Sequence, residues 1–297
     1  RSDLTIASCL RYLENNLKGK EKIFYSGQAY RKSENKSDSI IRDQIGFEIL
    51  GSKDEKNDDK EIINTSLKSL QNVKYSSGKL TIGNVEIFNL LISKLDIPKR
   101  WKLRLSRHFW REDYFNDLLK RLETNSDVDP TIVEIDKKKY QKMLKQDQSR
   151  QIAGRSLNEI LTRFNNKIKD PRRAKKGRNV SKIIKEFLKI NCPINQAPNK
   201  LNIFFKKYKI NIRVQNNYFP VTKNKLAKLN VKFSASFGRQ LEYYTGLVFR
   251  IDIKQKSKNT NIINGGRYDN LISDLGSAKK TPRSEEHTSE LQSRPHI

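Results

Sequence analysis

Two strands that flank a polar junction late in the chain constrain its fold more than any other feature. Residues 229–237 alternate apolar with polar side chains, and a second apolar run follows the junction. Strict alternation indicates a strand with one buried face and one polar face. The junction contains Arg239, Glu242, Tyr243 and Tyr244, before a Thr-Gly turn. Because such groups are costly to bury without partners, the junction is either a satisfied polar network or a ligand pocket.

A second predicted hairpin joins a strand at residues 22–31 to a returning strand at residues 42–51. On the returning strand Gln44, Gly46 and Glu48 share one face, because successive side chains of a strand point to opposite sides. An amide and a carboxylate on either side of a glycine leave a floor on which a small polar molecule can sit. The competing interpretation is an ordinary solvent-facing strand side, where charged residues mostly lie.

Helical periodicity dominates the rest of the chain. At its start Ile6, Leu10, Leu13 and Leu17 form an apolar stripe of the kind that packs on a core. A helical middle segment of about residues 86–208 follows. Its candidate core residues are Trp101, Leu105, Phe109, Leu118, Leu119 and Leu122.

Local signals predict three further features. The charged stretch at residues 52–60 is expected to be a solvated loop, and residues 101–122 a continuous helix. A strand beginning at residue 262 is expected to enter a turn at Gly265 and Gly266, because two glycines let the backbone approach a ligand or a neighbouring strand closely.

The charge balance favours polyanion partners but does not locate a site for them. The chain has 61 Lys and Arg against 33 Asp and Glu, a formal net charge of +28. The cations are spread along a sequence rich in Lys, Asn and Ile. The densest positive run, residues 167–178, is broken by Pro171 and Gly177, which favours a solvated loop. A nucleic-acid-binding module that uses this run is therefore only a weak hypothesis for the function of the chain.

Several classes of protein are disfavoured. Cys9 and Cys192 lack a CxxC spacing and the three histidines form no cluster, so we expect no metal site, no disulfide framework and no cofactor. We see neither an apolar run of membrane-spanning length nor a signal peptide. We therefore expect a cytoplasmic protein without a membrane partner.

Residues 283–297 differ from the rest of the chain. The Lys, Asn and Ile bias vanishes there, and the stretch resembles translated sequencing-adaptor read-through. We therefore expect a native domain at residues 1–282, truncated at both ends, followed by a non-native tail that carries no function.

Four stretches in order resemble the histidyl-tRNA synthetase core, a class II synthetase domain. They are RSDLT at the start, FYSGQAYR with DQIGFEILG in the first hairpin, GRQLEYYTGLVFRID at the polar junction, and GGRYDNLISDLG after it. The resemblance covers most of residues 1–282. It implies an α+β fold with an antiparallel six-stranded sheet flanked by helices and a helical insertion, which agrees with the predicted hairpins.

The family contains the synthetase and a non-catalytic relative, the regulatory subunit of the short-form ATP phosphoribosyltransferase. RSDLT is closer to the relative's RPDLT than to the synthetase's RPEGT. The synthetase pattern places a glutamate two positions after Arg31, where Ser33 stands, and a histidine where Asp43 stands. Residues 79–190 also look like the helical middle of alphaproteobacterial regulatory subunits. These departures favour the non-catalytic relative.

The resemblance implies a histidine-binding pocket and a nucleotide-phosphate contact. Arg31 matches the arginine that contacts ATP phosphate in the synthetase, and Arg239 stands where its catalytic arginine stands. Carboxylates at Asp3, Glu48 and Glu242 can face the ammonium or imidazole of histidine, and Arg239 its carboxylate. The full set of histidine-binding-like residues is Asp3, Thr5, Gln44, Glu48, Arg239, Glu242, Tyr243, Tyr244 and Tyr268.

We therefore expect a regulatory subunit with no catalytic residues of its own. It would assemble with the catalytic short-form ATP phosphoribosyltransferase in the first step of histidine biosynthesis, support its activity, and transmit feedback from L-histidine as effector. A homodimer within a hetero-oligomer is the expected assembly. The alternative is a histidine–tRNA ligase, under which tRNA would also be a partner, and Arg239 is the strongest point in its favour.

Overall fold

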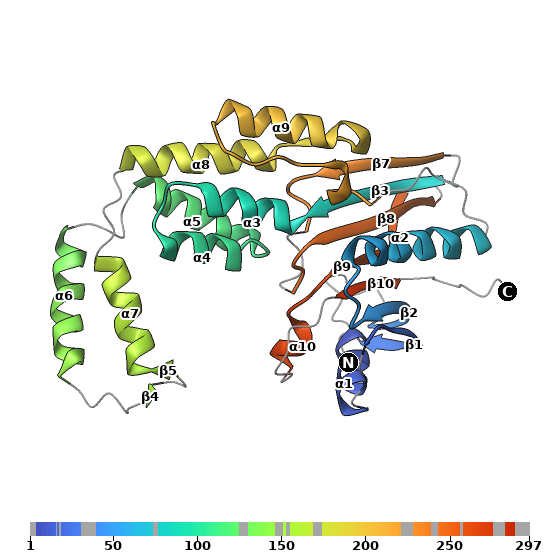
Figure 1. Cartoon of the computed structure of the whole chain (residues 1–297), viewed down its shortest axis with the longest axis horizontal. Helices are drawn as coiled ribbons and strands as arrows, with labels where there is room; N and C mark the ends of the chain where they lie inside the picture. Colours follow the sequence, from blue (N-terminus) through green and yellow to red (C-terminus); the bar gives the residue numbers. More distant parts are fainter. Residues whose placement is uncertain are drawn as a thin grey trace.

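The computed structural model describes residues 4–15, 17, 19–30, 40–73, 77–124, 130–145, 151–152, 155–168, 174–220, 228–238, 243–255, 258–275 and 283–288. It contains a large sheet, helices packed on the sheet, and a helical body beyond one end of the strands (Figure 1).

Within the described residues the sheet has eight strands, in the order β1-β2-β10-β9-β8-β3-β7-β6. Their bounds are β1 Glu21–Tyr30, β2 Ile41–Leu50, β3 Ser77–Asn84, β6 Asn191–Pro193, β7 Lys228–Ser234, β8 Leu247–Gln255, β9 Lys258–Arg267 and β10 Arg283–Thr288. Neighbouring strands are antiparallel except β3 and β7, which run parallel. The α+β class is confirmed, whereas the expected purely antiparallel sheet of six strands becomes a mixed sheet of eight. The short strands β4 Gln151–Ile152 and β5 Arg155–Ser156 pair separately.

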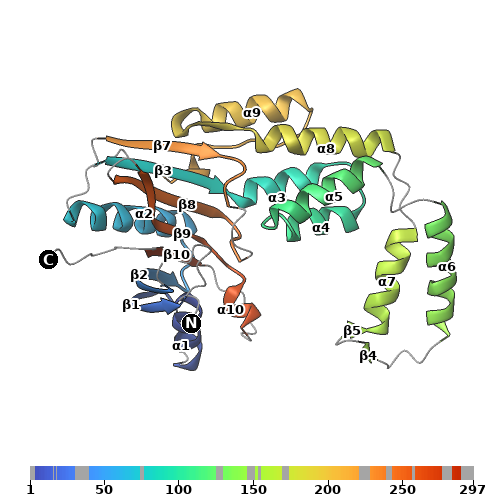
Figure 2. The same cartoon turned by 180° about the vertical axis from the view of Figure 1, so that it is seen from behind.

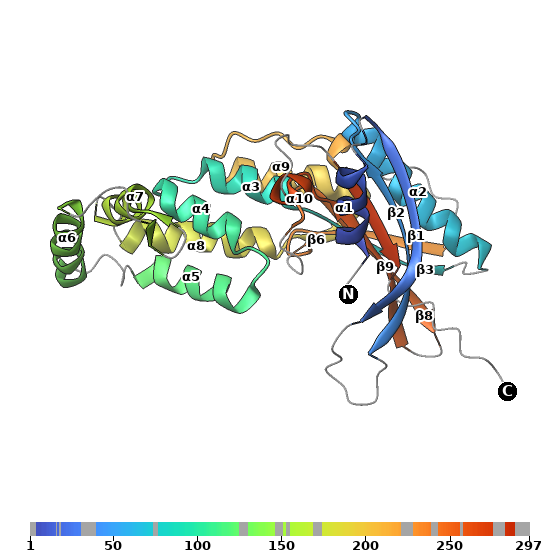
Figure 3. The same ribbon diagram turned by 90° about the horizontal axis from the view of Figure 1, so that it is seen from below.

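The helices cover the sheet and build the middle segment. Their bounds are α1 Thr5–Glu14, α2 Glu55–Asn72, α3 Val85–Lys94, α4 Lys99–Arg107, α5 Glu112–Thr124, α6 Pro130–Leu144, α7 Leu157–Ile168, α8 Ala174–Leu188, α9 Ala197–Lys207 and α10 Leu271–Asp274, with short 3₁₀ turns η2 Ile194–Gln196 and η3 Asn216–Tyr218. Helices α1 and α2 lie on opposite sides of strands β1, β2 and β9 (Figure 3). Helices α3, α4, α5 and α8 lie beyond the end of the sheet, and α6 and α7 stand farther out (Figures 1 and 2).

The core of the helical middle segment is aromatic. All six candidate core residues from 101 to 122 are buried, as predicted. The expected continuous helix is interrupted, because α4 ends at Arg107 and α5 begins at Glu112. The interruption lets Phe109 turn inward and stack on Phe88, with ring centroids 3.9 Å apart. Such aromatic pairs add to the stabilisation that burial already provides.

Helix α1 presents a different face to the core than the apolar stripe predicts. Ile6, Leu10 and Leu17 are exposed, whereas Cys9 and Tyr12 are buried. The inward face carries hydrogen-bonding groups, and the Tyr12 hydroxyl donates to the carbonyl of Gly19, which precedes β1, at 3.1 Å. Helical periodicity identifies the most apolar face of a helix as the buried one. For α1, which covers a polar site, this predicted the wrong orientation.

Two charged stretches that were expected to be loops are partly helical. Residues 55–60 belong to α2, because the Asp54 side chain caps the helix by accepting from the backbone N–H of Asn57 at 3.4 Å. Glu55 in the first turn suits the positive end of the helix dipole. In the basic run, α7 extends to Ile168 and α8 begins at Ala174, while residues 169–173 lie outside the described range.

The Gly265–Gly266 pair lies within strand β9 rather than in a turn. A Cβ added to Gly266 would lie 2.7 Å from both the Leu247 carbonyl oxygen and Cδ1 of Tyr244. The absence of a side chain at Gly266 therefore allows the neighbouring strand and the Tyr244 ring to approach closely.

Strand β10 falls in the stretch that was expected to be non-native. Its backbone pairs with β2 on one side and β9 on the other. Ladder hydrogen bonds involve the backbone of any extended segment, so this pairing does not test the origin of residues 283–297. Their non-native origin stays a prediction.

Candidate functional site

A hydrogen bond between two fully buried side chains lies at the centre of the candidate site. Tyr268 follows β9, and its hydroxyl donates to Oε2 of Glu48 on β2. Both residues have 0% exposure. A carboxylate loses its hydration on burial, so a donor placed at its oxygen stabilises it. The solvent-facing interpretation of this side of β2 is therefore wrong.

Gln44 is buried on the same strand face as Glu48, two alternations away. Only 3% of Gln44 is exposed, and neither its Oε1 nor its Nε2 has a hydrogen-bond partner in the described part of the chain. A buried polar group without a partner costs about 1–3 kcal/mol. Such a group requires an explanation in a native structure. A ligand that offers one donor and one acceptor would satisfy it.

The floor between Gln44 and Glu48 is covered by an aromatic ring. Tyr25 is the antiparallel partner of Gly46. A Cβ added to Gly46 would lie 2.1 Å from Cζ of Tyr25, so the ring rests on the glycine. The space that Gly46 opens is therefore taken by the Tyr25 side chain. Gln44 and Glu48 lie on either side of Gly46 along the same strand face.

Tyrosines from the polar junction close another side of the site. Tyr244 is 7% exposed and rests on Gly266, as described above. The ring of Tyr243 lies 4.9 Å from that of Tyr244 and 5.9 Å from that of Tyr268, measured between centroids. The three rings thus connect the junction after β7 to the Glu48 hydrogen bond.

The start of α1 completes the wall. The Thr5 hydroxyl oxygen lies 3.2 Å from the Tyr25 hydroxyl oxygen, and Cys9 Sγ lies 3.9 Å from that of Tyr268. Thr5 and Cys9 are 1% and 0% exposed. Helix α1 therefore meets this face of the sheet through hydroxyl and thiol groups.

The structure thus links residues that are far apart in sequence and were predicted to form one pocket. Contacts through Tyr25 and the two glycines join the predicted site residues Thr5, Glu48, Tyr243, Tyr244 and Tyr268, and Gln44 lies on the same strand face as Glu48. Asp3, Arg31, Arg239 and Glu242 lie outside the described residues, so their assignments stay predictions.

Sequence reasoning missed Tyr25 and Cys9. A signal for Tyr25 was available, because a large side chain directly opposite a glycine in an antiparallel pair covers that glycine. Cys9 carried no signal, because its role follows from the unexpected orientation of α1.

Within the described residues, no group of three or more His, Cys, Asp or Glu side chains is placed to hold a metal ion. The described helices include none that has both the length and the apolar character needed to cross a membrane.

A mainly antiparallel sheet with a buried polar site on one face, together with a helical insertion, has the architecture of a class II aminoacyl-tRNA synthetase core. The family model for histidyl-tRNA synthetase matches residues 1–180 and 173–281. These matches cover most of the chain, which therefore belongs to the histidyl-tRNA synthetase family.

Two curated relatives carry the same name. The ATP phosphoribosyltransferase regulatory subunit of Sinorhizobium fredii is 26% identical over 303 residues, which cover 95% of this chain and 78% of the relative. The protein of the same name from Brucella anthropi is 25% identical over 299 residues, which cover 95% of this chain and 79% of that relative.

Solved structures of similar proteins are more distant. A Bacillus halodurans structure described as an ATP phosphoribosyltransferase regulatory subunit/histidyl-tRNA synthetase has a TM-score of 0.49 and 18% identity, and this chain covers 62% of it. An ATP phosphoribosyl transferase complex from Thermotoga maritima has a TM-score of 0.48 and 17% identity, with 80% of that chain covered. In both cases 97% of this chain is aligned.

Proposed function

We propose that the chain is a regulatory subunit of ATP phosphoribosyltransferase that catalyses no reaction itself. The observation that carries this proposal is the similarity to curated relatives of that name over 95% of the chain. The altered positions at Ser33 and Asp43 add to it, because the synthetase pattern has a glutamate and a histidine there. The subunit assembles with the catalytic short-form transferase in the cytoplasm and acts at the first step of histidine biosynthesis.

The buried polar site is proposed to bind L-histidine as the feedback effector. Glu48 and Gln44 offer a carboxylate and an amide on one strand face, and the amide has no hydrogen-bond partner among the described residues; both side chains are shielded from water. An amino acid with an ammonium group, a carboxylate and an imidazole supplies the donors and acceptors that such groups require. Feedback then requires histidine to bind the active and inhibited states of the complex with different affinity.

Reconstitution tests the proposal. The full chain is co-expressed with the short-form catalytic subunit of the same genome, and formation of phosphoribosyl-ATP is followed by absorbance with and without L-histidine. We expect the two chains to co-elute, the catalytic subunit to be much more active in the complex, and histidine to inhibit the complex. Failure to co-elute, or equal activity of the catalytic subunit alone, contradicts the proposal.

The second candidate is a histidine–tRNA ligase, and Arg239 in the polar junction is the observation that favours it. A ligase activates histidine with ATP, so it exchanges pyrophosphate into ATP in a histidine-dependent reaction. We expect the chain to show no such exchange. Robust exchange would replace the regulatory proposal by the ligase.

A further inference from the structure

Three arginines surround a single tyrosine in the helical body beyond the sheet. Tyr114 and Arg121 lie on α5, Arg104 lies on α4, and Arg111 lies between these two helices. The guanidinium carbons of Arg111 and Arg121 lie 5.4 Å and 6.0 Å from the centroid of the Tyr114 ring. Nη2 of Arg104 donates to the Tyr114 hydroxyl at 3.0 Å. Three positive charges are therefore gathered around one phenol ring, and we call this group the arginine cluster.

Two arginines of the cluster are also held by tryptophan rings. The guanidinium carbon of Arg104 lies 5.5 Å from the centroid of the Trp101 ring, and that of Arg111 lies 5.6 Å from the centroid of the Trp110 ring. Trp101 has 0% exposure and is a fixed support. Aromatic faces attract guanidinium groups and leave the N–H groups at their edges able to donate. The arginines are therefore oriented before any ligand arrives.

The carboxylates of α5 do not neutralise the cluster. Glu112 and Asp113 lie in the first turn, where the helix dipole favours negative charge. Asp117 forms an ion pair with Lys120 at 3.5 Å. Across the part of the chain that the structure describes, the three guanidinium groups contact aromatic rings and a hydroxyl but form no ion pair with a carboxylate.

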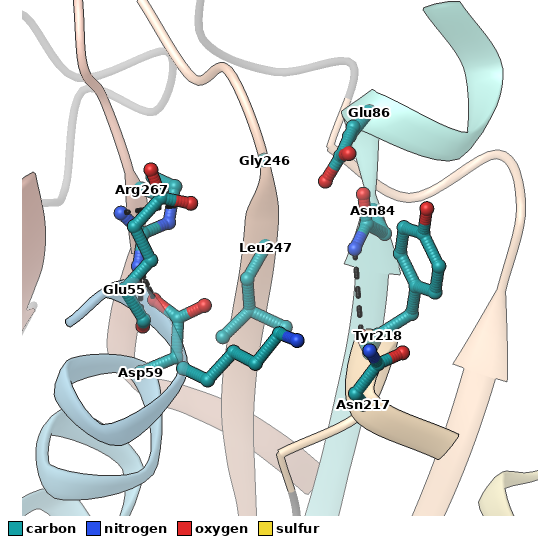
Figure 4. Close-up of a pocket in the computed structure, with 10 residues that line it drawn as sticks. Glu55, Asp59, Asn84, Glu86, Asn217, Tyr218, Gly246, Leu247 and Arg267 are labelled. Atoms are coloured by element: carbon teal, nitrogen blue, oxygen red, sulfur yellow. Dashed lines mark hydrogen bonds and ion pairs between the residues drawn. The ribbon is translucent and has the colours of Figure 1, made fainter. Parts of the chain in front are cut away.

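A different arginine shows what a neutralised guanidinium looks like in this protein. Arg267 lines a pocket beside α2, and its guanidinium lies 2.9 Å from Asp59 and 3.9 Å from Glu55 (Figure 4). Its charge is therefore used within the chain, whereas the charges of the arginine cluster are not.

Two further donors in the cluster have no acceptor. The Tyr114 hydroxyl accepts from Arg104, and no group among the described residues accepts its own proton. The Nε1 atom of Trp110 is buried and has no hydrogen-bond partner in the described part of the chain. Phenol and indole both carry a proton to donate, and buried polar atoms without a partner require an explanation. The unpaired groups of the cluster are thus donors, so its ligand must be an acceptor.

The hydroxyl of Tyr114 lies in a positive electrostatic environment. The hydrogen bond from Arg104, together with the charges of Arg104, Arg121 and Arg111, outweighs partial burial and lowers the pKa of Tyr114. Surroundings that stabilise a phenolate also stabilise another anion at that place.

We propose that the arginine cluster binds a phosphate group through Arg104, Arg111 and Arg121, with the Tyr114 hydroxyl as a fourth donor. A phosphate group offers up to two negative charges and three acceptor oxygens, whereas a carboxylate has one charge and two oxygens. Three convergent arginines suit one such group, while a nucleic-acid backbone is contacted along a stripe of cations. The site is independent of the proposed regulatory function, because it uses the helical body and not the Glu48 site.

Tryptophan fluorescence of the full chain tests this proposal. The chain has two tryptophans, Trp101 and Trp110, and both contact the cluster. Inorganic pyrophosphate and ADP are titrated at constant ionic strength, with acetate as the control anion. We expect a saturable change with both phosphates and none with acetate. Equal affinities support recognition of the phosphate groups alone, and tighter binding of ADP supports a nucleotide.

Three outcomes of this titration overturn the proposal. They are an equal response to acetate, no saturable response to either phosphate compound, and binding of an RNA duplex by a chain that responds to neither small phosphate. The last outcome would assign the cluster to a nucleic-acid surface.

Variants locate the binding groups. Arg111→Gln and Arg121→Gln change exposed side chains, and each is expected to weaken pyrophosphate binding about tenfold, because a charge-assisted hydrogen bond is lost. Arg11→Gln removes the same charge from an exposed position of α1 and is expected to leave binding unchanged. Unchanged affinity in folded Arg111→Gln and Arg121→Gln, or an equal loss in Arg11→Gln, overturns the assignment.

The wild-type chain gives an answer even if these variants do not fold. In a nitrogen-15 NMR spectrum the indole N–H of Trp110 is one of two such signals, and Trp110→Phe identifies it. We expect this signal to shift saturably as pyrophosphate is added. A signal that does not move at saturating pyrophosphate overturns the proposal.

Discussion

Arg267 and Tyr268 are neighbours in the chain and serve opposite faces of the sheet. Arg267 forms an ion pair with Asp59 of α2, and Tyr268 donates a hydrogen bond to Glu48 on the face that α1 covers. Both are almost fully buried. A single peptide unit at the end of β9 therefore connects the proposed histidine site to the ion pairs of Arg267. Loss of either polar contact is expected to affect stability as well as ligand binding.

Tyr268→Phe removes the donor to Glu48 without changing the shape of the ring. The buried carboxylate loses its hydrogen bond, so we expect the free energy of unfolding to fall by about 1–3 kcal/mol. Urea denaturation measures this change, and calorimetry measures the accompanying loss of histidine affinity. Tyr30→Phe is the matched control, because Tyr30 is 48% exposed. Equal effects of the two substitutions would contradict the central role of the Glu48 contact.

Gln44→Leu separates stability from binding. The amide of Gln44 has no partner in the described part of the chain, so an apolar side chain of similar size should leave the free protein as stable or make it more stable. The same substitution should abolish histidine binding, because the ligand loses its amide contact. The control is Gln28→Leu at an exposed position of β1. A large loss of stability with unchanged histidine binding would refute the assignment of Gln44.

The alternation around Gln44 and Glu48 made one polar strand face predictable, and the GGRYD stretch made Tyr268 predictable as its neighbour. The pairing of β2 with β9 through β10 was not predictable, because strand order depends on contacts between distant segments. The orientation of α1 was missed for a physical reason. Periodicity ranks faces by apolarity, whereas Cys9 and Thr5 face inward to meet hydroxyl groups.

The ion pairs of Arg267 could not be found from local patterns. The carboxylates of Glu55 and Asp59 come from α2, whereas Arg267 comes from the end of β9. Residues 55–60 look like a solvated loop in sequence, because charged residues are mostly exposed. Only the fold shows that Asp59 is turned toward a buried arginine.

Gly46→Ala tests the close contact between Tyr25 and the sheet. The new methyl group would lie 2.1 Å from Cζ of Tyr25, so the ring must move. We expect a loss of about 1–3 kcal/mol in the free energy of unfolding. In the Tyr25→Ala background the same substitution should cost much less, since the obstructing ring is gone. A double-mutant cycle by urea denaturation measures this coupling, and additive effects would contradict it.

Glu123 gives a prediction for the helical middle segment at low pH. Its Oε1 accepts from Lys185 at 2.5 Å and from Ser181 at 2.6 Å, which ties α5 to α8. These two hydrogen bonds, that of Lys185 first, lower the pKa of Glu123. Because the folded-state pKa lies below the unfolded one, the contribution to stability is present above the unfolded pKa and is lost as pH falls through the folded pKa.

Glu123→Gln should therefore reduce stability at neutral pH by about 0.5–1 kcal/mol, a modest value because Glu123 and Lys185 are partly exposed. The difference from wild type should vanish in acid, where the carboxyl group is protonated in both folded and unfolded chains. Thermal unfolding from neutral to acidic pH measures it, with Glu14→Gln as an exposed control. A difference that persists unchanged in acid would mean that side-chain packing, rather than the charge of Glu123, holds α5 against α8.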